Sequence, residues 1–252
     1  MKTLNSKLLL PTLLAGSMFA AVQANAATIY IDDFTALQSL TDTTVGNGGE
    51  FAEILAAGAV GGYRDLIVDN MNAGLGLNPT TTGSSGGSGI SDPVGLFSLS
   101  NSSGVEGSAT LQYDGNDNSA DLDTDGLNLD LSSVDSFSLD IFDQDLQPME
   151  VAITVWDNDS SFTVTRINYT PIDISNGSGD PFNPRINLSW SFTEFTDIDF
   201  SMIGAIEMVI SGPAGLDTTV GPLKAVPEPS AAALLALGVA GLALGRRRAA
   251  RK

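Results

Sequence analysis

Short runs of alternating apolar and polar residues recur along the middle of the chain, separated by clusters of Gly, Asn, Asp and Ser. In Ser136–Ile141 the apolar residues fall on one face of an extended chain and the polar residues on the other, as in a half-buried strand. Val151–Trp156 is more apolar throughout, which is typical of a strand buried on both faces. The nine predicted strands are Thr28–Asp32, Asp65–Asn70, Leu96–Ser100, Ala109–Tyr113, Phe137–Phe142, Val151–Trp156, Phe162–Asn168, Ile186–Phe192 and Ala205–Ser211.

These strands, without a helix between each pair, predict an all-β fold: one β-sandwich of jelly-roll type over residues 27–224. A single two-turn helix is expected at Gly49–Gly58. The composition of Thr82–Ser91 predicts a flexible loop, and Asn176–Pro184 a second turn-rich loop. The region is long enough to bury a core without disulfides or metals.

The first 26 residues have the three parts of a secretory signal peptide. Lys2 and Lys7 form a positive start, Leu8–Val22 is apolar, and Ala24-Asn25-Ala26 supplies the small residues that precede cleavage. We therefore expect a signal helix, removed by signal peptidase between Ala26 and Ala27. The alternatives are a transmembrane anchor or a buried helix.

The C-terminal end has a similar composition in reverse order. Pro227-Glu228-Pro229 precedes the apolar residues 231–245, and an arginine-rich run closes the chain. Because a helix of 15 residues spans only about 22 Å, it is short for a bilayer core of roughly 30 Å. Snorkelling arginines can absorb the difference, and they favour a cytoplasmic C-terminus. This segment predicts a single transmembrane helix that anchors the exported domain in the membrane.

Pro-Glu-Pro, a short apolar helix and a terminal arginine cluster together resemble the PEP-CTERM sorting signal, over residues 226–252. The resemblance implies that Pro227, Glu228 and Pro229 are recognised by an exosortase, a membrane enzyme that processes such tails. It also implies a Gram-negative bacterium that makes exopolysaccharide, with the protein displayed on the cell surface or in the extracellular matrix after processing. An ordinary tail anchor or a core helix is the alternative.

Charge and composition exclude several classes of function. The chain has a net charge of −19, and residues 27–224 hold four basic and 29 acidic residues, a formal charge of −25. Such a surface repels nucleic acid and attracts cations such as calcium. Without cysteine or histidine, the chain has no disulfide, lipidated cysteine, Ser-His-Asp or Cys-His catalysis, or histidine-held metal.

Other segments resemble the jelly-roll ectodomains that are often attached to PEP-CTERM tails. They are Gly61-Gly62-Tyr63-Arg64-Asp65, Tyr113-Asp114-Gly115, Phe192…Phe195…Phe200 and Ile203–Glu207. This resemblance implies a galactose-binding-like sandwich, a fold often used to bind carbohydrate, although a fold alone does not establish a function.

An aspartate-rich segment, Asp114–Gly126, could supply oxygen ligands for calcium. The candidate ligands are Asp114, Asp117, Asp121, Asp123 and Asp125. The last three, with Gly126, match the opening of an EF-hand loop, but Ser132 stands where the bidentate glutamate belongs and no helices flank it. The segment is therefore either a calcium loop in a β-sandwich or a solvated acidic turn. No cofactor is expected beyond a possible calcium ion.

Aromatic residues are candidates for sugar contacts or for core packing: Trp156, Trp190 and Tyr63, with Asp157, Asn158 and Asp159 beside the first. Arg64-Asp65 predicts an internal ion pair or a structural hydrogen-bonding residue; the alternative is a ligand carboxylate held by Arg64. The leading expectation is a non-enzymatic surface or matrix protein that binds exopolysaccharide. The alternatives are a purely structural acidic protein and a glycan-active enzyme that uses two carboxylates.

Overall fold

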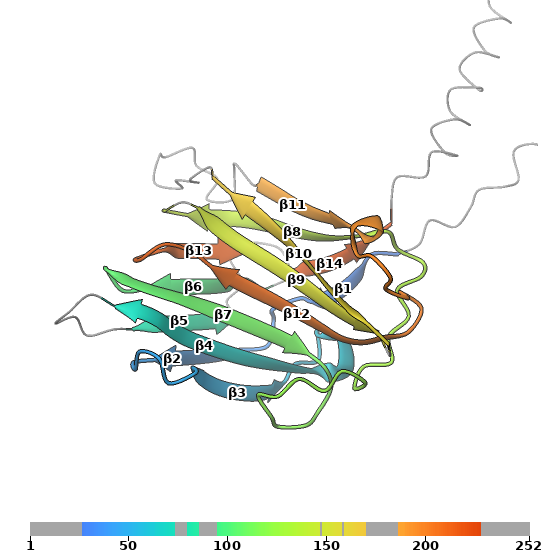
Figure 1. The fold of residues 1–252 in the computed structure, drawn as a ribbon, viewed down its shortest axis with the longest axis horizontal. Helices are drawn as coiled ribbons and strands as arrows, with labels where there is room; N and C mark the ends of the chain where they lie inside the picture. The colour runs from blue at the N-terminus through green and yellow to red at the C-terminus, as the bar shows by residue number, and fades with distance from the viewer. Residues whose placement is uncertain are drawn as a thin grey trace, which may run out of the picture. The chain divides into compact units, whose positions relative to one another are not determined.

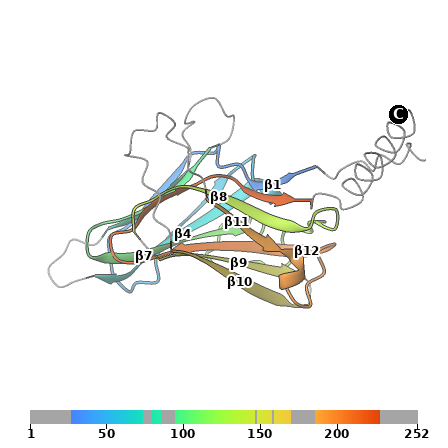
Figure 2. The ribbon, with the colours of Figure 1, turned by 90° about the horizontal axis from the view of Figure 1, so that it is seen from above.

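The computed structural model describes residues 27–73, 80–85, 95–146, 148–157, 159–169 and 186–227. Ala27–Val226 forms one compact unit made of two antiparallel sheets, which Figures 1 and 2 show stacked face to face. The predicted all-β fold with a single sandwich is confirmed. The predicted signal helix, the helix at 231–245, Glu228 and Pro229 lie outside the described residues. Among the described residues, no helix is long and apolar enough to cross a membrane.

The first sheet has six strands and faces the viewer in Figure 1. Their spatial order is β10 (Ser161–Asn168), β9 (Met149–Asp157), β12 (Ile203–Ser211), β7 (Val105–Tyr113), β4 (Tyr63–Ala73) and β3 (Glu50–Leu55). A short 3₁₀ turn, η2 (Val60–Gly62), leads into β4.

The second sheet has eight strands. They follow the order β1 (Ile29–Asp32), β14 (Leu223–Val226), β8 (Ser136–Gln144), β13 (Asp217–Val220), β6 (Phe97–Asn101), β5 (Thr81–Ser85) and β2 (Gln38–Asp42), with β11 (Ile186–Ser191) on the other edge of β8. A second 3₁₀ turn, η4 (Phe192–Glu194), follows β11.

Alternate side chains of both sheets fill the space between them and exclude water. The six-stranded sheet contributes Leu66, Val68, Leu111, Val151, Ile153, Val155, Ile206 and Met208, and the eight-stranded sheet contributes Ile31, Phe97, Leu99, Phe137, Leu139, Ile141 and Trp190, all nearly or fully buried. Because side chains alternate along a strand, the residues between these on the six-stranded sheet point away from the core. We call that side the outer face.

Three predictions about individual segments were wrong or incomplete. The expected helix Gly49–Gly58 is the edge strand β3, which pairs with β4 along its whole length. Part of the expected loop Thr82–Ser91 belongs to β5, and the remainder lies outside the described residues, as does Asn176–Pro184. Val151–Trp156 is fully buried on the core face but only partly on the other, where Thr154 is buried while Ala152 and Trp156 are half-buried.

The guanidinium of Arg64 lies inside the sandwich and is fully buried. Its Nη1 donates to Asp32 Oδ2 at 2.8 Å, and its Nε donates to Gln38 Oε1 at 2.8 Å. Arg64 is thus an internal ion-pair residue, as expected, but its partner is Asp32 on β1 and not its neighbour Asp65. This pair connects β4 of one sheet to β1 of the other.

Candidate functional site

Two carboxylates face each other on the outer face of the β3–β4 hairpin. Glu53 on β3 and Asp65 on β4 are register partners, with Ile54 opposite Arg64 one step further along. Like charges placed directly opposite in a sheet destabilise the pairing. The hairpin therefore places two acidic groups together at a cost to strand pairing.

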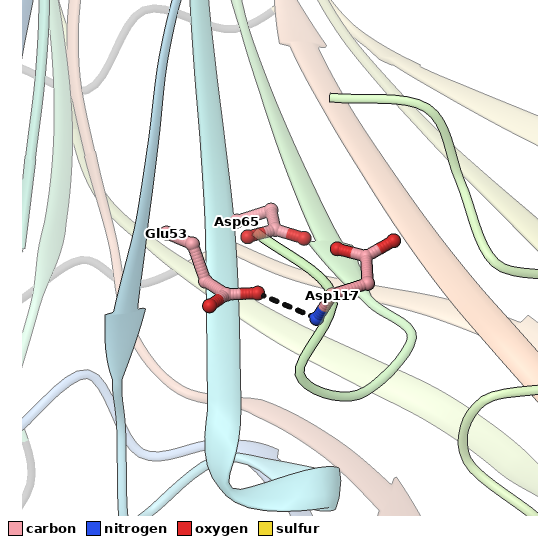
Figure 3. Close-up of side chains that lie close together, drawn as sticks. All are labelled: Glu53, Asp65 and Asp117. Atoms are coloured by element: carbon pink, nitrogen blue, oxygen red, sulfur yellow. Dashed lines mark hydrogen bonds between the residues drawn. The ribbon is translucent and has the colours of Figure 1, made fainter. Parts of the chain in front are cut away.

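A third carboxylate arrives from the acidic loop, residues Asp114–Gly126, which follows β7. Oxygens of Glu53, Asp65 and Asp117 all lie within 4.8 Å of one another (Figure 3). Glu53 Oε2 also accepts hydrogen bonds from the backbone N–H groups of Asp117, at 3.0 Å, and Asn118, at 2.8 Å. Glu53 thus fixes the loop against the hairpin and brings the three carboxylates together.

The central member of this group is buried and lacks a hydrogen-bond donor. Asp65 is 1% exposed, and neither of its carboxylate oxygens has a hydrogen-bond partner. The same holds for Oδ1 of Asp114, which is also buried, and for Oε1 of Gln112, the register partner of Asp65 on β7. A buried acceptor without a donor costs about 1–3 kcal/mol, and more when it is charged.

The surroundings disfavour a bare negative charge at this point. Burial, then the charge of Asp114, followed by the charges of Glu53 and Asp117, raise the pKa of Asp65 to about 8. Burial likewise raises the pKa of Asp114. The surroundings of Asp65 therefore favour the neutral form of its carboxyl over a bare negative charge.

The basic side chains that the structure describes are engaged elsewhere. Arg64 pairs with Asp32 inside the sandwich, Arg166 pairs with Glu194, and Lys224 lies 3.4 Å from Asp140. Within the described ranges, no lysine or arginine forms an ion pair with the carboxylates of the hairpin and the loop. The negative charge of the hairpin and loop carboxylates is therefore not neutralised by any basic side chain that the structure describes.

The five predicted calcium ligands are placed in different ways. Asp117 joins Glu53 and Asp65, and Asp114 lies next to Asp65, whereas Asp121, Asp123 and Asp125 are exposed and belong to no such group. The loop aspartates instead shape the turn: Asp123 Oδ1 accepts from the N–H of Asp125 at 3.1 Å, and the N–H of Asp123 donates to Asp114 Oδ2 at 2.9 Å.

Sequence reasoning missed Glu53 and did not connect Asp65 with the acidic loop. Both positions lie about 50 or more residues before the loop, and Glu53 was placed on an expected helix. A correct hairpin assignment would have exposed the signal, because it places Glu53 directly opposite Asp65.

A second feature of the outer face is a row of polar side chains that crosses all six strands. Register partners follow one another from the hairpin to the far edge: Glu53, Asp65, Gln112, Glu207, Thr154 and Thr163. Gln112 Nε2 donates to Glu207 Oε2 at 3.0 Å, and the hydroxyls of Thr154 and Thr163 are 2.9 Å apart. At about 4.8 Å per strand the row extends roughly 24 Å. We call this set the polar row.

The three candidate aromatic residues lie in different environments. Trp190 is fully buried and its indole N–H donates to Val164 O at 3.1 Å, so it is a core residue that connects β11 to β10. Trp156 is half-buried, two residues beyond Thr154 on the same face of β9. Tyr63 is also half-buried, at the start of β4. Asp157 caps its own turn, accepting from the N–H groups of Asp159 at 2.9 Å and Ser160 at 2.7 Å, and Asn158 lies outside the described residues.

A hollow of 320 Å³ lies near the other end of the strands that carry the polar row. Its lining includes Met71, Glu106, Glu150 and Ser211. The volume is at the low end of that of small-molecule sites.

Comparison with protein families gives a match at the C-terminus. Residues 225–248 match the family model described as the PEP-CTERM protein-sorting motif. This confirms the resemblance drawn from Pro227-Glu228-Pro229 and the residues after them. The chain therefore combines a β-sandwich with the sorting motif of exported proteins. No curated protein matches the chain in sequence.

Several solved structures align with the sandwich at low identity. The family 11 carbohydrate-binding module from Clostridium thermocellum, in complex with a β-1,3-1,4-mixed-linked tetrasaccharide, is 11% identical, with a TM-score of 0.40 over 80% of this chain and 98% of that chain. TmCBM61, in complex with β-1,4-galactotriose, is 10% identical, with a TM-score of 0.28 over 77% of this chain and 90% of that chain. CBM28, a module specific for non-crystalline cellulose, is 8% identical, with a TM-score of 0.29 over 64% of this chain and 86% of that chain.

Proposed function

We propose that this protein is a non-catalytic surface protein, sorted through its PEP-CTERM tail, whose sandwich binds a neutral extracellular polysaccharide. Signal peptidase removes residues 1–26, the helix at 231–245 holds the chain in the membrane, and an exosortase then processes the tail. The product stays at the cell surface or in the surrounding matrix. The sorting part of this proposal is supported by the motif match at 225–248.

The observation that supports binding is the polar row beside Trp156 on the outer face. Sugar hydroxyls need donors and acceptors, which half-buried Glu207 and exposed Thr163 can supply. Gln112 and Thr154 are buried and hydrogen-bond to these two side chains, which fixes their positions. The apolar face of a sugar ring packs against an aromatic ring, and half-buried Trp156 lies on the same face of β9. An extended chain laid across the strands would meet Thr163, Trp156 and Glu207 in succession.

Charge indicates the kind of polysaccharide. Along the polar row the ionisable groups are Glu53, Asp65 and Glu207, all acidic, and Glu150 is exposed on the same face. An anionic polysaccharide would be repelled, so a neutral chain of hexoses fits this face better. The alternative drawn from the sequence is a purely structural acidic protein, and it predicts that no polysaccharide retains the chain.

The experiment is affinity electrophoresis of the full chain in gels that contain a neutral glucan, galactan or mannan, or a polyuronate. We expect retardation by at least one neutral polymer and none by the polyuronate. Trp156→Ala or Glu207→Ala should weaken the binding about tenfold or more. Tyr30→Ala is the matched aromatic control, because Tyr30 is 43% exposed but lies on β1 of the other sheet.

Retardation only by the polyuronate, or by none of these polymers, would contradict the proposal. Binding that survives both Trp156→Ala and Glu207→Ala would exclude the polar row as its site. If Trp156→Ala does not fold, Thr163→Ala tests the same row, since this hydroxyl is exposed on β10.

A further inference from the structure

We propose that a calcium ion binds between the β3–β4 hairpin and the acidic loop, held by the carboxylates of Glu53, Asp65 and Asp117. This inference does not depend on polysaccharide binding. The three residues come from β3, β4 and the segment after β7, so the ion would join the loop to the sheet (Figure 3).

The spacing of the three carboxylates suits calcium. Calcium–oxygen distances are about 2.3–2.6 Å, so two ligand oxygens on opposite sides of one ion lie up to roughly 5 Å apart. The oxygens of Glu53, Asp65 and Asp117 lie within 4.8 Å of one another. One ion between them lies close to coordination distance from all three oxygens, and small side-chain rotations would close the remaining gap.

A cluster of acidic residues alone would not establish a site; the buried, donor-free carboxylate of Asp65 is the second observation. Asp65 is 1% exposed and both of its oxygens lack a hydrogen-bond partner. Figure 3 shows its carboxylate lying toward Glu53 and Asp117. A group buried in this way needs a proton or a cation, and a cation can also be shared by the carboxylates of Glu53 and Asp117.

Oxygens for the remaining coordination positions are nearby. Oδ1 of Asp114 and Oε1 of Gln112 are buried without a partner, and both residues adjoin Asp65 through contact or register. Calcium takes six to eight oxygens in flexible geometry, whereas magnesium demands a near-ideal octahedron. An all-oxygen set from two strands and a loop, with water, fits calcium better.

The test is thermal unfolding of the full chain after treatment with a chelator, followed by titration with calcium chloride. Extracellular modules bind calcium with Kd values of about 10⁻⁴–10⁻³ M, so about 10 mM should raise the Tm by roughly 5 °C. Magnesium chloride at the same concentration should give a smaller rise, and sodium chloride of equal ionic strength none.

The decisive variant is Asp65→Asn, which keeps the shape of the side chain but removes its charge. It should abolish the calcium response while keeping a calcium-free Tm at or above that of the natural chain, because a buried carboxyl group without hydrogen-bond partners is replaced by a neutral amide of the same shape. Asp121→Asn is the matched control: it makes the same charge change in the same loop, outside the group of three, and should respond like the natural chain.

Absence of a calcium response in the natural chain would overturn the proposal. An undiminished response in Asp65→Asn would place any ion elsewhere and overturn it as well, and equal rises with magnesium and calcium would overturn the choice of metal. If Asp65→Asn fails to fold, Glu53→Gln gives the same comparison. Polysaccharide binding by a chain that ignores calcium would leave the proposed function intact while this inference fails.

Discussion

Arg64 and Asp65 are consecutive residues whose side chains lie on opposite faces of β4. The guanidinium of Arg64 points into the sandwich and binds Asp32, Gln38 and Ser85, while the carboxylate of Asp65 lies with Glu53 and Asp117 on the outer face. Alternation along the strand therefore separates a buried cation from the carboxylate beside it in sequence. Each of the two charges depends on partners from distant segments.

Removing the cation of this pair should strongly destabilise the fold. Arg64→Met leaves Asp32, which is 1% exposed, as an uncompensated buried charge. Breaking a buried ion pair in this way costs about 3–5 kcal/mol. Urea unfolding should show this loss for Arg64→Met and a loss below about 1 kcal/mol for Arg166→Met, whose pair with Glu194 is partly exposed. Equal losses for the two variants would contradict the role given to the buried pair.

Gly204 permits the acidic loop to lie against the start of β12. A Cβ at this position would stand 1.8 Å from the carbonyl oxygen of Thr124. Gly204→Ala should therefore push the loop away and destabilise the protein by about 1–3 kcal/mol. The rate of hydrogen exchange of the loop amides should also be higher in this variant than in the natural chain.

Gly212→Ala is the comparison for that variant, because its nearest obstacle is the end of the Leu216 side chain, which can move. It should have a smaller effect on the Tm and none on exchange in the acidic loop. Unchanged exchange in Gly204→Ala would show that the close approach of Thr124 does not hold the loop.

Asp157 should make stability depend on acidity below about pH 4. Burial by itself would raise the pKa of this carboxyl, but hydrogen bonds from the N–H groups of Asp199, Asp159 and Ser160 outweigh that effect and lower the pKa. The folded state therefore favours the ionised form, and its contribution is present above the unfolded pKa near 4 and is lost as the pH falls through the folded value.

The measurement is Tm against pH from 7 down to 3 for the natural chain and Asp157→Asn. The amide cannot accept from all of these groups, so the variant should melt lower at pH 7. The two curves should converge as the pH falls, because the natural carboxyl then becomes protonated. A constant gap across the range would contradict this assignment.

The end of β14 limits where the tail can be cut. Val226 closes a strand that is hydrogen-bonded to β8 and β1, and Pro227 follows it directly. A cut before Val226 would remove part of this strand, so the processed C-terminus should lie at or beyond Pro227. Mass spectrometry of surface and released material should find this end together with an N-terminus at Ala27. An intact arginine-rich tail in every fraction would contradict processing.

The sequence predicted the long strands and missed the short or weakly patterned ones. All nine expected strands are present, because each has a clear apolar face or a continuous apolar run. β2, β5 and β13 (QSLTD, TTGSS and DTTV) contain few large apolar residues, and only their pairing with neighbours defines them. β3 (EFAEIL) contains good helix formers, but pairing with β4 overrides that preference.

One of the three proposed metal ligands was visible in the sequence. Asp117 stands in an aspartate-rich segment that attracts attention by composition, whereas Glu53 and Asp65 are isolated acidic residues in strands. Their proximity follows from the register of the hairpin and from the path of the acidic loop back over β3 and β4. Neither is a local property of the sequence.

The double pairing of β14 also determines how the sandwich bears mechanical force. Ala225 lies between Ile29 of β1 and Phe137 of β8 in the ladder, so the strand is bonded along both edges. When the tail is tethered, tension enters at Val226, and the component of that force along β14 pulls the strand along its own axis. Ladder bonds run perpendicular to the strand, so they share this load in shear and do not open one after another. Tension on the tail is thus passed directly to β8 and the core it covers, and the last strand is not peeled away.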